Sequence, residues 1–575
     1  MVALTDRAQS GRLTMEVSAL PETTVMRSLD WDRDRFDIEF GLQNGTTYNS
    51  FLIRGEKIAL VDTSHLKFQE LYLDILKQQI DPATIDYLII SHTEPDHSGL
   101  VKHILELAPE ITVVGAKVAI QFLEDLVHTP FQRQLVKNGD TLDLGNGHLL
   151  EFVSAPNLHW PDTIFTYDHK TQILFTCDAF GMHYCSDHTY DENMAELEPD
   201  FRFYYECLMA PNARSVLSAI KRMESLGEVT TIATGHGPLL RHNVREWVGR
   251  YAEWSQAQTK GETTVAVFYI SDYGYCDLLS QALAHGITKT GVHVEMMDLR
   301  SADSQELREL VSDATGLVIP TPPASGSELG EVEGAISTIL ASTHKKQTFG
   351  IYESGADNSL SVYPLDVKFK GAGLKGAFPS IRITETPSAN TYKLCEEAGT
   401  DMGQQLSLKK AVQQMKSLDS DLDKALGRLS GGLYLITATK GEVSSAMLAS
   451  WVSQASFQPL GLTIAVAKDR AIEALMQVGD TFVLNVLAED NYQKLMKHFL
   501  QRFAPGADRF AGVGIQRANN GSPILAEALA YLECEVGSRM ELSDHWLVYA
   551  TVQNGRVSDP DAIPAVHHRK VGNHY

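Results

Sequence analysis

The sequence has few cysteines, and none of them are closely paired. No two of the six stand in a C-x-x-C arrangement, and they lie at Cys177, Cys185, Cys207, Cys276, Cys395 and Cys534. An appended rubredoxin is therefore excluded, because it would need two paired-cysteine knuckles to hold its iron. Scattered single cysteines are instead typical of proteins in a reducing compartment such as the cytosol.

Long hydrophobic runs are also missing. No stretch reaches the roughly 20 apolar residues that a membrane-spanning helix requires. The first residues, Met1 to Met15, contain no apolar core of a signal peptide. We therefore expect a soluble, cytoplasmic protein without a transmembrane segment, and peripheral association with a membrane stays open.

Positive charge is scarce. The chain has 49 Lys and Arg residues against 73 Asp and Glu residues, so its formal net charge at pH 7 is -24. This balance argues against nucleic acid as a partner, because phosphate binding needs a basic face. Apolar residues make up 43% and charged residues 21%, as in ordinary soluble globular proteins. At 575 residues the chain is too long for a single core.

Within the first 236 residues, seven side chains that can bind metal lie at the ends of apolar runs. Four lie in the segment S-H-T-E-P-D-H-S-G after the apolar run 85–90, and each of the other three follows a further apolar run. Strand alternation would point His92 and Glu94 toward one metal, while Pro95 and Gly99 predict a loop, not a helix, that turns toward a second metal. The spacing therefore predicts a dinuclear site at one edge of a sheet, formed by His92, Glu94, Asp96, His97, His159, Asp178 and His236.

This ligand order resembles the metallo-β-lactamase superfamily, whose zinc hydrolases carry H-x-H-x-D-H. Here Glu94 replaces the second histidine. A site with four imidazoles and three carboxylates is harder and more anionic than a zinc hydrolase site, which suits a pair of redox-active irons. The pattern resembles the flavodiiron proteins over residues 1–260. That resemblance implies one iron on His92, Glu94 and His159, a second on Asp96, His97 and His236, and a bridging Asp178.

From residue 263 onward, strand-like runs alternate with helical patterns. Four such runs lie at 264–270, 292–297, 316–320 and 347–352. The alternation is typical of a doubly wound parallel sheet. Residues 263–405 resemble a flavodoxin, in which the loops after the strands hold FMN. The resemblance implies cofactor contacts by Ser271, Tyr273, Gly274, Tyr275, Thr321, Pro322, Pro323, Ala324, Glu353, Ser354 and Gly355.

The first of these loops departs from the flavodoxin pattern in two respects. It has fewer hydroxyl groups than the usual T-x-T-G-N-T, and it places Asp272 and Asp277 near the expected flavin phosphate.

The last part of the chain is rich in β-patterns. Residues 425–575 resemble the flavin reductase family. The sequence motifs that carry the resemblance are S-S-A-M-L-A-S-W, Q-A-S-F-Q-P, F-V-L-N-V-L and S-D-H-W. The resemblance implies a split β-barrel that binds FMN or FAD and takes hydride from NAD(P)H. Its implied cofactor contacts are Ser450, Trp451, Ser456 and His545. Between the two flavin modules, the pattern of residues 406–424 predicts a helical linker that takes no part in catalysis or cofactor binding.

Over the whole chain, this order of modules resembles the flavodiiron proteins of oxygenic phototrophs. The resemblance implies a multidomain α/β fold: a metallo-β-lactamase-like αββα sandwich, a flavodoxin-like sheet and a split barrel. It also implies that electrons pass from NAD(P)H or ferredoxin through flavins to two non-haem irons, which reduce O2 to water. Such a protein would serve as an electron sink that protects photosynthetic electron transport. A head-to-tail homodimer, or a heterodimer with a paralogue, would bring one subunit's FMN to the other's irons.

Several alternatives remain open at the level of sequence. A nitric oxide reductase would use the same seven ligands. A zinc hydrolase would keep the fold but needs no flavin modules, and Glu94 argues against it. A non-catalytic partner subunit is disfavoured because all seven ligand positions are filled.

Overall fold

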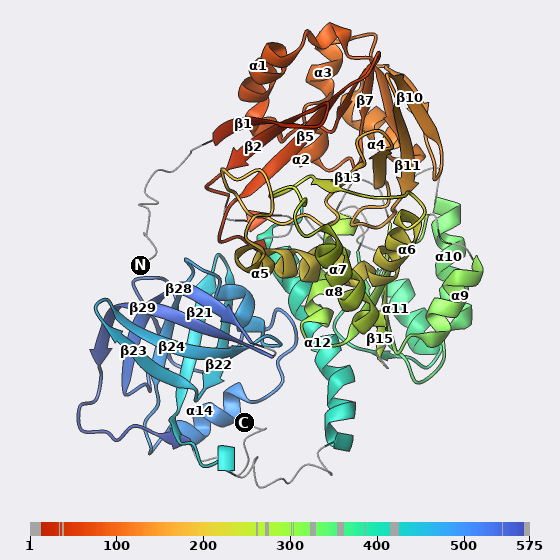
Figure 1. Cartoon of the computed structure of the whole chain (residues 1–575). Coiled ribbons are helices and arrows are strands. Elements are labelled where there is room, and N and C mark those ends of the chain that lie inside the picture. The colour runs from red at the N-terminus through yellow and green to blue at the C-terminus, as the bar shows by residue number, and fades with distance from the viewer. Residues whose placement is uncertain are drawn as a thin grey trace. The chain divides into compact units, whose positions relative to one another are not determined.

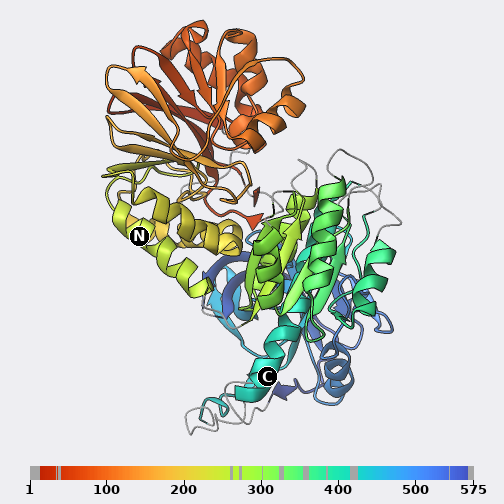
Figure 2. The ribbon, with the colours of Figure 1, turned by 90° about the vertical axis from the view of Figure 1, so that its right-hand side faces the viewer.

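The computed structural model describes residues 13–33, 35–36, 40–259, 263–270, 275–300, 302, 304–322, 329–353, 362–383, 386–414, 425–542 and 544–567. The chain divides into two compact units, Met1–Glu262 and Thr263–Tyr575 (Figure 1 and Figure 2). No described helix is both long and apolar enough to cross a membrane.

The N-terminal unit contains two facing sheets. The first has the order β1 (Leu13–Leu20), β2 (Thr23–Asp30), β5 (Thr46–Arg54), β6 (Ile58–Val61), β7 (Tyr87–Ile89), β8 (Thr112–Gly115) and β9 (Gln132–Leu135). The second has the order β10 (Thr141–Gly145), β11 (His148–Ser154), β12 (Ile164–Asp168), β13 (Ile173–Cys177) and β14 (Thr231–Thr234). A small ribbon of β3 (Arg35–Phe36) and β4 (Phe40–Gly41) adjoins them.

Helices complete the layers of this unit. They are α1 (Gln69–Gln79), α2 (Pro95–Ser98), α3 (Val101–Leu107), α4 (Lys117–Val127), α5 (Met194–Tyr204), α6 (Ala213–Met223) and α7 (Val244–Thr259). Short helical turns lie at η1 (Leu66–Phe68), η2 (Pro82–Thr84), η3 (Tyr205–Met209) and η4 (Ala210–Asn212).

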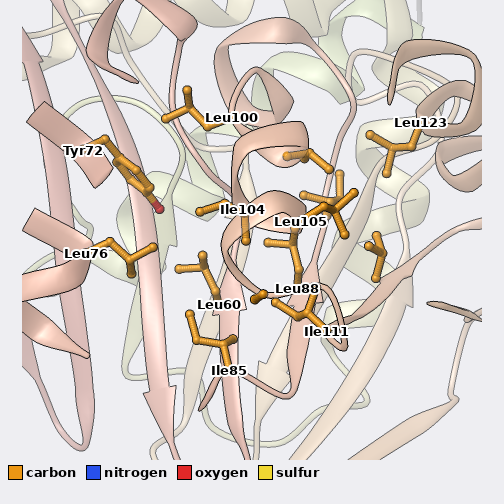
Figure 3. Packing of buried hydrophobic residues seen from close by; sticks show 14 of the residues in the cluster. Leu60, Tyr72, Leu76, Ile85, Leu88, Leu100, Ile104, Leu105, Ile111 and Leu123 are labelled. Carbon is orange, nitrogen blue, oxygen red and sulfur yellow. The ribbon is translucent and has the colours of Figure 1, made fainter. Parts of the chain in front are cut away.

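Alternation along the strands divides the core into two layers. On β6, Ala59 and Val61 face the second sheet, where they join a cluster with Phe152 and Phe175. Leu60, between them, faces the helices. Figure 3 shows this outer cluster, in which β6, β7, α1 and α3 pack through Leu60, Leu88, Tyr72, Leu76, Leu100 and Ile104. Each such fully buried side chain stabilises the fold by about 1.5–3 kcal/mol. The result is the predicted αββα sandwich.

One local prediction is wrong. Pro95 was expected to keep the ligand segment in a loop, yet it begins the short helix α2, with Glu94 as the preceding cap residue. Proline lacks only an N–H that the first turn of a helix leaves unbonded, and its fixed φ suits that position. A proline after a strand therefore starts a helix as readily as it prevents one.

The first half of the C-terminal unit is a parallel sheet with the order β16-β15-β17-β18-β19. This order is that of a flavodoxin-like doubly wound fold, as predicted. The strands are β15 (Thr264–Tyr269), β16 (His293–Asp298), β17 (Gly316–Pro320), β18 (Thr348–Tyr352) and β19 (Lys375–Gly376). The helices are α8 (Cys276–Thr288), α9 (Ser304–Asp313), α10 (Leu329–Ser342), α11 (Val362–Gly371) and α12 (Ala389–Gln414).

The predicted helical linker overlaps the last of these helices. Residues 406–414 form the end of α12 and Leu406 is buried. Residues 415–424 lie outside the described part of the chain.

The second half of this unit is an antiparallel sheet with the order β22-β21-β25-β28-β29-β24-β23. Its strands are β21 (Tyr434–Lys440), β22 (Val443–Ala449), β23 (Val452–Phe457), β24 (Leu460–Ala467), β25 (Thr481–Val486), β28 (Ala530–Glu541) and β29 (His545–Val557). Within the described residues β22 and β23 are not paired, so the barrel is split. Smaller elements are β20 (Gly431–Gly432), β26 (Ile515–Arg517), β27 (Pro523–Leu525), β30 (Val566–His567), η6 (Ala471–Leu475) and α14 (Tyr492–Phe499).

Candidate metal centre

All seven predicted ligands come together at one edge of the N-terminal sandwich. His92 and Glu94 follow β7, and the next two ligands lie in α2. His159 occupies the turn between β11 and β12, while Asp178 and His236 follow the parallel strands β13 and β14. Parallel strands end at the same edge of a sheet, which brings together residues far apart in sequence.

The ligands form two groups, each with two imidazoles and one carboxylate. In the first, Glu94 Oε2 lies 3.2 Å from His92 Nε2 and 3.1 Å from His159 Nε2. In the second, Asp96 Oδ1 lies 3.5 Å from His97 Nε2, and Asp96 Oδ2 lies 3.4 Å from His236 Nε2. The donor atoms of each group are close enough to share one metal ion.

Asp178 lies between the two groups. Its Oδ2 is 3.1 Å from His159 Nε2 and 3.6 Å from His92 Nε2. Its Oδ1 is 2.8 Å from His97 Nε2 and 3.3 Å from His236 Nε2. Each carboxylate oxygen therefore faces a different group, as a bridging ligand requires.

Burial makes these charges strongly dependent on one another. Burial alone would lower the pKa of His92, but Asp162, Glu94 and Asp178 outweigh it and raise that pKa to about 10. The pKa of His97 is raised in the same way to about 9. Although burial opposes ionisation of the carboxyls, the histidines hold the pKa values of Glu94 and Asp178 well below their usual range. The opposite charges of the ligand set therefore compensate one another inside the protein.

Neighbouring groups fix the orientation of the imidazoles. His92 Nδ1 lies 3.1 Å from Asp162 Oδ1, whose other oxygen accepts hydrogen bonds from the Thr93 backbone and hydroxyl. His236 Nδ1 donates to the Thr47 carbonyl oxygen at 2.7 Å. Such partners leave Nε2 free to bind metal and hold the ring in place. The buried His183 ring packs against His236, with their centroids 4.6 Å apart.

Three groups that contact the ligands were not predicted from the sequence: Asp162, Thr47 and His183. For Asp162, the signal was its position three residues after a predicted ligand, in the word H-W-P-D. Its partner is nevertheless His92, 70 residues earlier in the chain, so the sequence position did not reveal which histidine it orients. No sequence pattern marks the Thr47 carbonyl or the His183 ring, and their contacts with His236 are visible only in the folded structure.

The backbone around the ligands is unusually constrained. Asn157, Cys177 and Phe180, which flank His159 and Asp178, have positive φ values of 64°, 52° and 65°. For residues other than glycine this region costs roughly 1–3 kcal/mol, and such residues cluster at functional sites.

A glycine permits the closest approach in the site. A Cβ added to Gly235 would lie only 2.7 Å from His97 Cε1 and 3.1 Å from the Cys177 carbonyl carbon. Only glycine lets the β14 loop pass this close to the ligands.

The predicted FMN contacts lie at the carboxyl ends of the flavodoxin-like strands. Tyr275 directly precedes α8, and Thr321, Pro322 and Glu353 follow β17 and β18. The Glu353 carboxylate is buried and accepts a hydrogen bond from the Ile383 backbone. Outside the described residues lie Ser271, Tyr273, Gly274, Pro323, Ala324, Ser354 and Gly355.

Three of the reductase-type contacts lie in or next to β23, and the fourth, His545, begins β29. The Trp451 and His545 rings are 5.2 Å apart, and Ser450 beside them is buried with no hydrogen-bond partner for its Oγ among the described residues. Ser456 lies at the far end of β23, where its hydroxyl donates to the Pro459 carbonyl at 2.6 Å. The structure therefore brings together three of these four residues.

Comparisons with known proteins agree with the fold. The family model described as "ODP family beta lactamase" matches residues 46–237. The family model described as "Flavin reductase like domain" matches residues 426–573. A diflavin flavoprotein A of Nostoc sp. is 68% identical over 577 residues and covers 100% of both chains. Diflavin flavoprotein A 1 of Synechocystis sp. is 64% identical over 565 residues and covers 98% of each chain.

A solved structure supports the same assignment. The metal-soaked Flv1 flavodiiron core from Synechocystis sp. matches with a TM-score of 0.65 and 36% identity, and covers 70% of this chain and 100% of that chain. From the full-length identity to these relatives, the chain belongs to the flavodiiron proteins, in the cyanobacterial diflavin flavoprotein A group with a C-terminal flavin reductase domain.

Proposed function

We propose that this oxidoreductase reduces O2 to water at a non-haem di-iron centre, with electrons from NAD(P)H that pass through two flavins. The observation that carries the proposal is the position of Asp178, whose two carboxylate oxygens face two separate groups of ligands. Four imidazoles with three carboxylates are a donor set that suits iron. Two adjacent irons, once bound, supply redox chemistry at O2, and the protein contributes placement, charge and electron supply.

The residues of the site have distinct parts in this proposal. His92, Glu94 and His159 hold one iron, while Asp96, His97 and His236 hold the other. Asp178, whose two oxygens face the two groups, would help to hold both irons. Asp162 orients His92 through the hydrogen bond to Nδ1, and so leaves Nε2 directed into the centre.

Both flavin modules belong to the proposal. FMN would bind the strand ends of the flavodoxin-like sheet, near Tyr275, Thr321 and Pro322. FMN or FAD would bind the split barrel near Ser450, whose buried hydroxyl lacks a protein partner among the described residues. Trp451 and His545 would receive the nicotinamide of NADH or NADPH, and ferredoxin is the alternative donor. In the cell the protein would act as an electron sink for photosynthetic electron transport.

The proposed assembly is a head-to-tail dimer, either of identical chains or with a paralogue. Electrons cross only short gaps efficiently, and in this assembly the FMN of one subunit would face the irons of the other.

The experiment is anaerobic reduction by NADH or NADPH followed by a pulse of O2, with flavin and iron oxidation states followed together. We expect both flavins and both irons to be reduced, and then to be reoxidised without release of peroxide. A parallel pulse of nitric oxide tests the rival reductase activity, since faster reoxidation by nitric oxide would assign that substrate instead. Zinc in place of iron after aerobic purification would point to the hydrolase.

The variant Asp178→Ala tests the centre itself. We expect iron to fall from about two per chain to almost none and O2 reduction to be lost, because both groups lose a ligand. Circular dichroism checks that the domain still folds. Full iron occupancy in this variant would contradict the bridging assignment.

A further inference from the structure

Helix α12 presents a row of polar side chains, most of them acidic. Glu396, Glu397, Asp401 and Gln404 follow one another along one side of the helix. The helix is fixed to α8 through glycines, since a Cβ at Gly286 would lie 2.0 Å from the Glu396 carbonyl oxygen. At Gly399, a Cβ would lie 2.1 Å from the Leu283 carbonyl oxygen. The acidic face of α12, Glu396 to Gln404, is therefore held rigidly on the flavodoxin-like sheet.

Side chains of the flavin reductase-like part pair with this face. Arg502 donates two hydrogen bonds to Asp401, from Nε to Oδ1 at 2.8 Å and from Nη2 to Oδ2 at 2.6 Å. Arg509 forms an ion pair with Glu397, and the Gln404 amide donates to Asp469. A two-pronged arginine contact to a carboxylate fixes orientation as well as distance.

A buried ionic cluster lies at the centre of the contact. Lys289, directly after α8, lies 2.5 Å from Glu396 Oε1 and also pairs with Glu473 of η6. Arg539 of β28 pairs with the other oxygen of Glu473. The side chains of Lys289, Glu473 and Arg539 are only 9%, 7% and 4% exposed. Charged side chains buried to this extent are costly unless they are paired with opposite charges. A loose contact between the flavodoxin-like and reductase-like parts is therefore disfavoured.

The surfaces around this cluster fit closely. A cavity of about 20 Å³ remains between them, lined among others by Lys289, Glu396, Ser445 and Leu475. That volume holds about one water molecule. The two parts are therefore packed against each other and not merely tethered.

We propose that the acidic face of α12, together with Lys289, is the docking surface for the flavin reductase-like part of the same chain. The occupant is identified by charge complementarity and by the bidentate Arg502 contact. Docking fixes the orientation of the two flavin-binding parts relative to each other. The proposal goes beyond the electron-transfer function, and its test needs no electron transfer.

The test is charge reversal at the exposed edge of the surface in the full chain. Arg502→Asp and Asp401→Arg, alone and combined, are compared with wild type by hydrogen–deuterium exchange of α12 and by small-angle X-ray scattering. We expect each single variant to increase exchange in α12 at least tenfold and to increase the radius of gyration. The double variant, which restores an opposite pair, is expected to return both quantities toward wild type.

The matched control is Lys494→Glu, which reverses a charge in an exposed pair with Glu527 within the reductase-like part. It is expected to leave exchange in α12 unchanged. Unchanged exchange in both single variants, or failure of the double variant to restore it, would overturn the proposal. A change in the mass of the oligomer that accompanies the opening would assign the surface to contacts between copies and would also overturn it.

Discussion

At the level of single residues, Glu94 distinguishes this site from that of a zinc hydrolase. An ionised carboxylate adds negative charge to its metal and stabilises the ferric over the ferrous state, whereas imidazole softens the site. We expect Glu94→His to bind relatively more zinc, to raise the potential of any iron retained, and to slow O2 reduction. Metal analysis and a redox titration of wild type and variant measure these effects. If the zinc-to-iron ratio and the potential both stay unchanged, Glu94 is not a ligand.

Gly235 tests how closely the site is packed. In Gly235→Ala the new methyl group would meet the His97 ring at 2.7 Å, so the ring must move away from its metal position. We expect iron to fall toward one per chain and stability to fall by about 1–3 kcal/mol, as for other overpacked sites. Iron analysis and urea unfolding measure both quantities.

The control for this variant is Gly249→Ala in α7, where a Cβ meets nothing within 4 Å. It should keep its iron and gain up to about 1 kcal/mol, because alanine favours the helix. If Gly235→Ala retains two irons, the loop that carries Gly235 can shift to accommodate the methyl group without loss of metal.

The sequence predicted which side chains meet at the edge of the sandwich better than it predicted the groups around them. A ligand such as Asp178 directly follows an apolar strand, so its type and position were both visible in the sequence. The partners that orient the ligands, such as the Thr47 carbonyl, come from backbone that any residue could supply. Gly235 was visible in the sequence only as part of a G-H-G turn, and its contact with His97 depends on how two loops approach in three dimensions.

At the level of elements, the ion pairs between η6, α8 and β28 predict a pH effect. Burial opposes the ionisation of Glu473, but Lys289 and Arg539 outweigh it and hold its pKa below the ordinary value of 4.5. A carboxyl whose pKa is lowered on folding adds stability above its unfolded pKa, and this stability is lost as the pH falls. Glu473→Gln should therefore destabilise the C-terminal unit by about 3 kcal/mol at pH 7. The difference from wild type should shrink as the pH falls below about 4.5.

Urea unfolding of wild type and variant at pH 7 and at pH 3 measures this effect, because the stabilisation is lost only as the pH falls from about 4.5 toward the lowered pKa of the folded state. Glu527→Gln, which breaks an exposed pair, is the control and should change stability by less than about 0.5 kcal/mol. An equal loss in Glu473→Gln at both pH values would mean that the ionised carboxylate is not the stabilising group.

Two elements show where local patterns mislead. The predicted loop at Pro95 is the helix α2, because proline suits a first turn. The predicted linker helix begins far earlier, at Ala389, because the flavodoxin-like fold needs a final helix to cover its sheet. The arginines that pair with the acidic side chains of that helix lie about 100 residues further along the chain.

At the level of the whole molecule, the three modules should be separable in function. Deletion of residues 425–575 is expected to abolish NAD(P)H oxidation and to spare O2 reduction that is driven by a chemically reduced flavin donor. A flavodiiron core of similar extent was solved for a Synechocystis relative, so the truncated chain should fold. Stopped-flow assays of both reactions provide the measurement. NAD(P)H oxidation at the full rate by the truncated chain would place hydride entry elsewhere.

The convergence of the seven ligands on one sheet edge also sets the order of events when the protein is made. His92 leaves the ribosome about 140 residues before His236, a delay of roughly 7–30 s at ordinary rates of translation. Within that interval the early ligands have no complete partner set, because β13 and β14 have yet to join the second sheet. Before β14 has been made, the chain therefore cannot assemble both ligand groups. Both ligand groups are complete only once β14 has joined the second sheet, when more than half of the chain has still to be made.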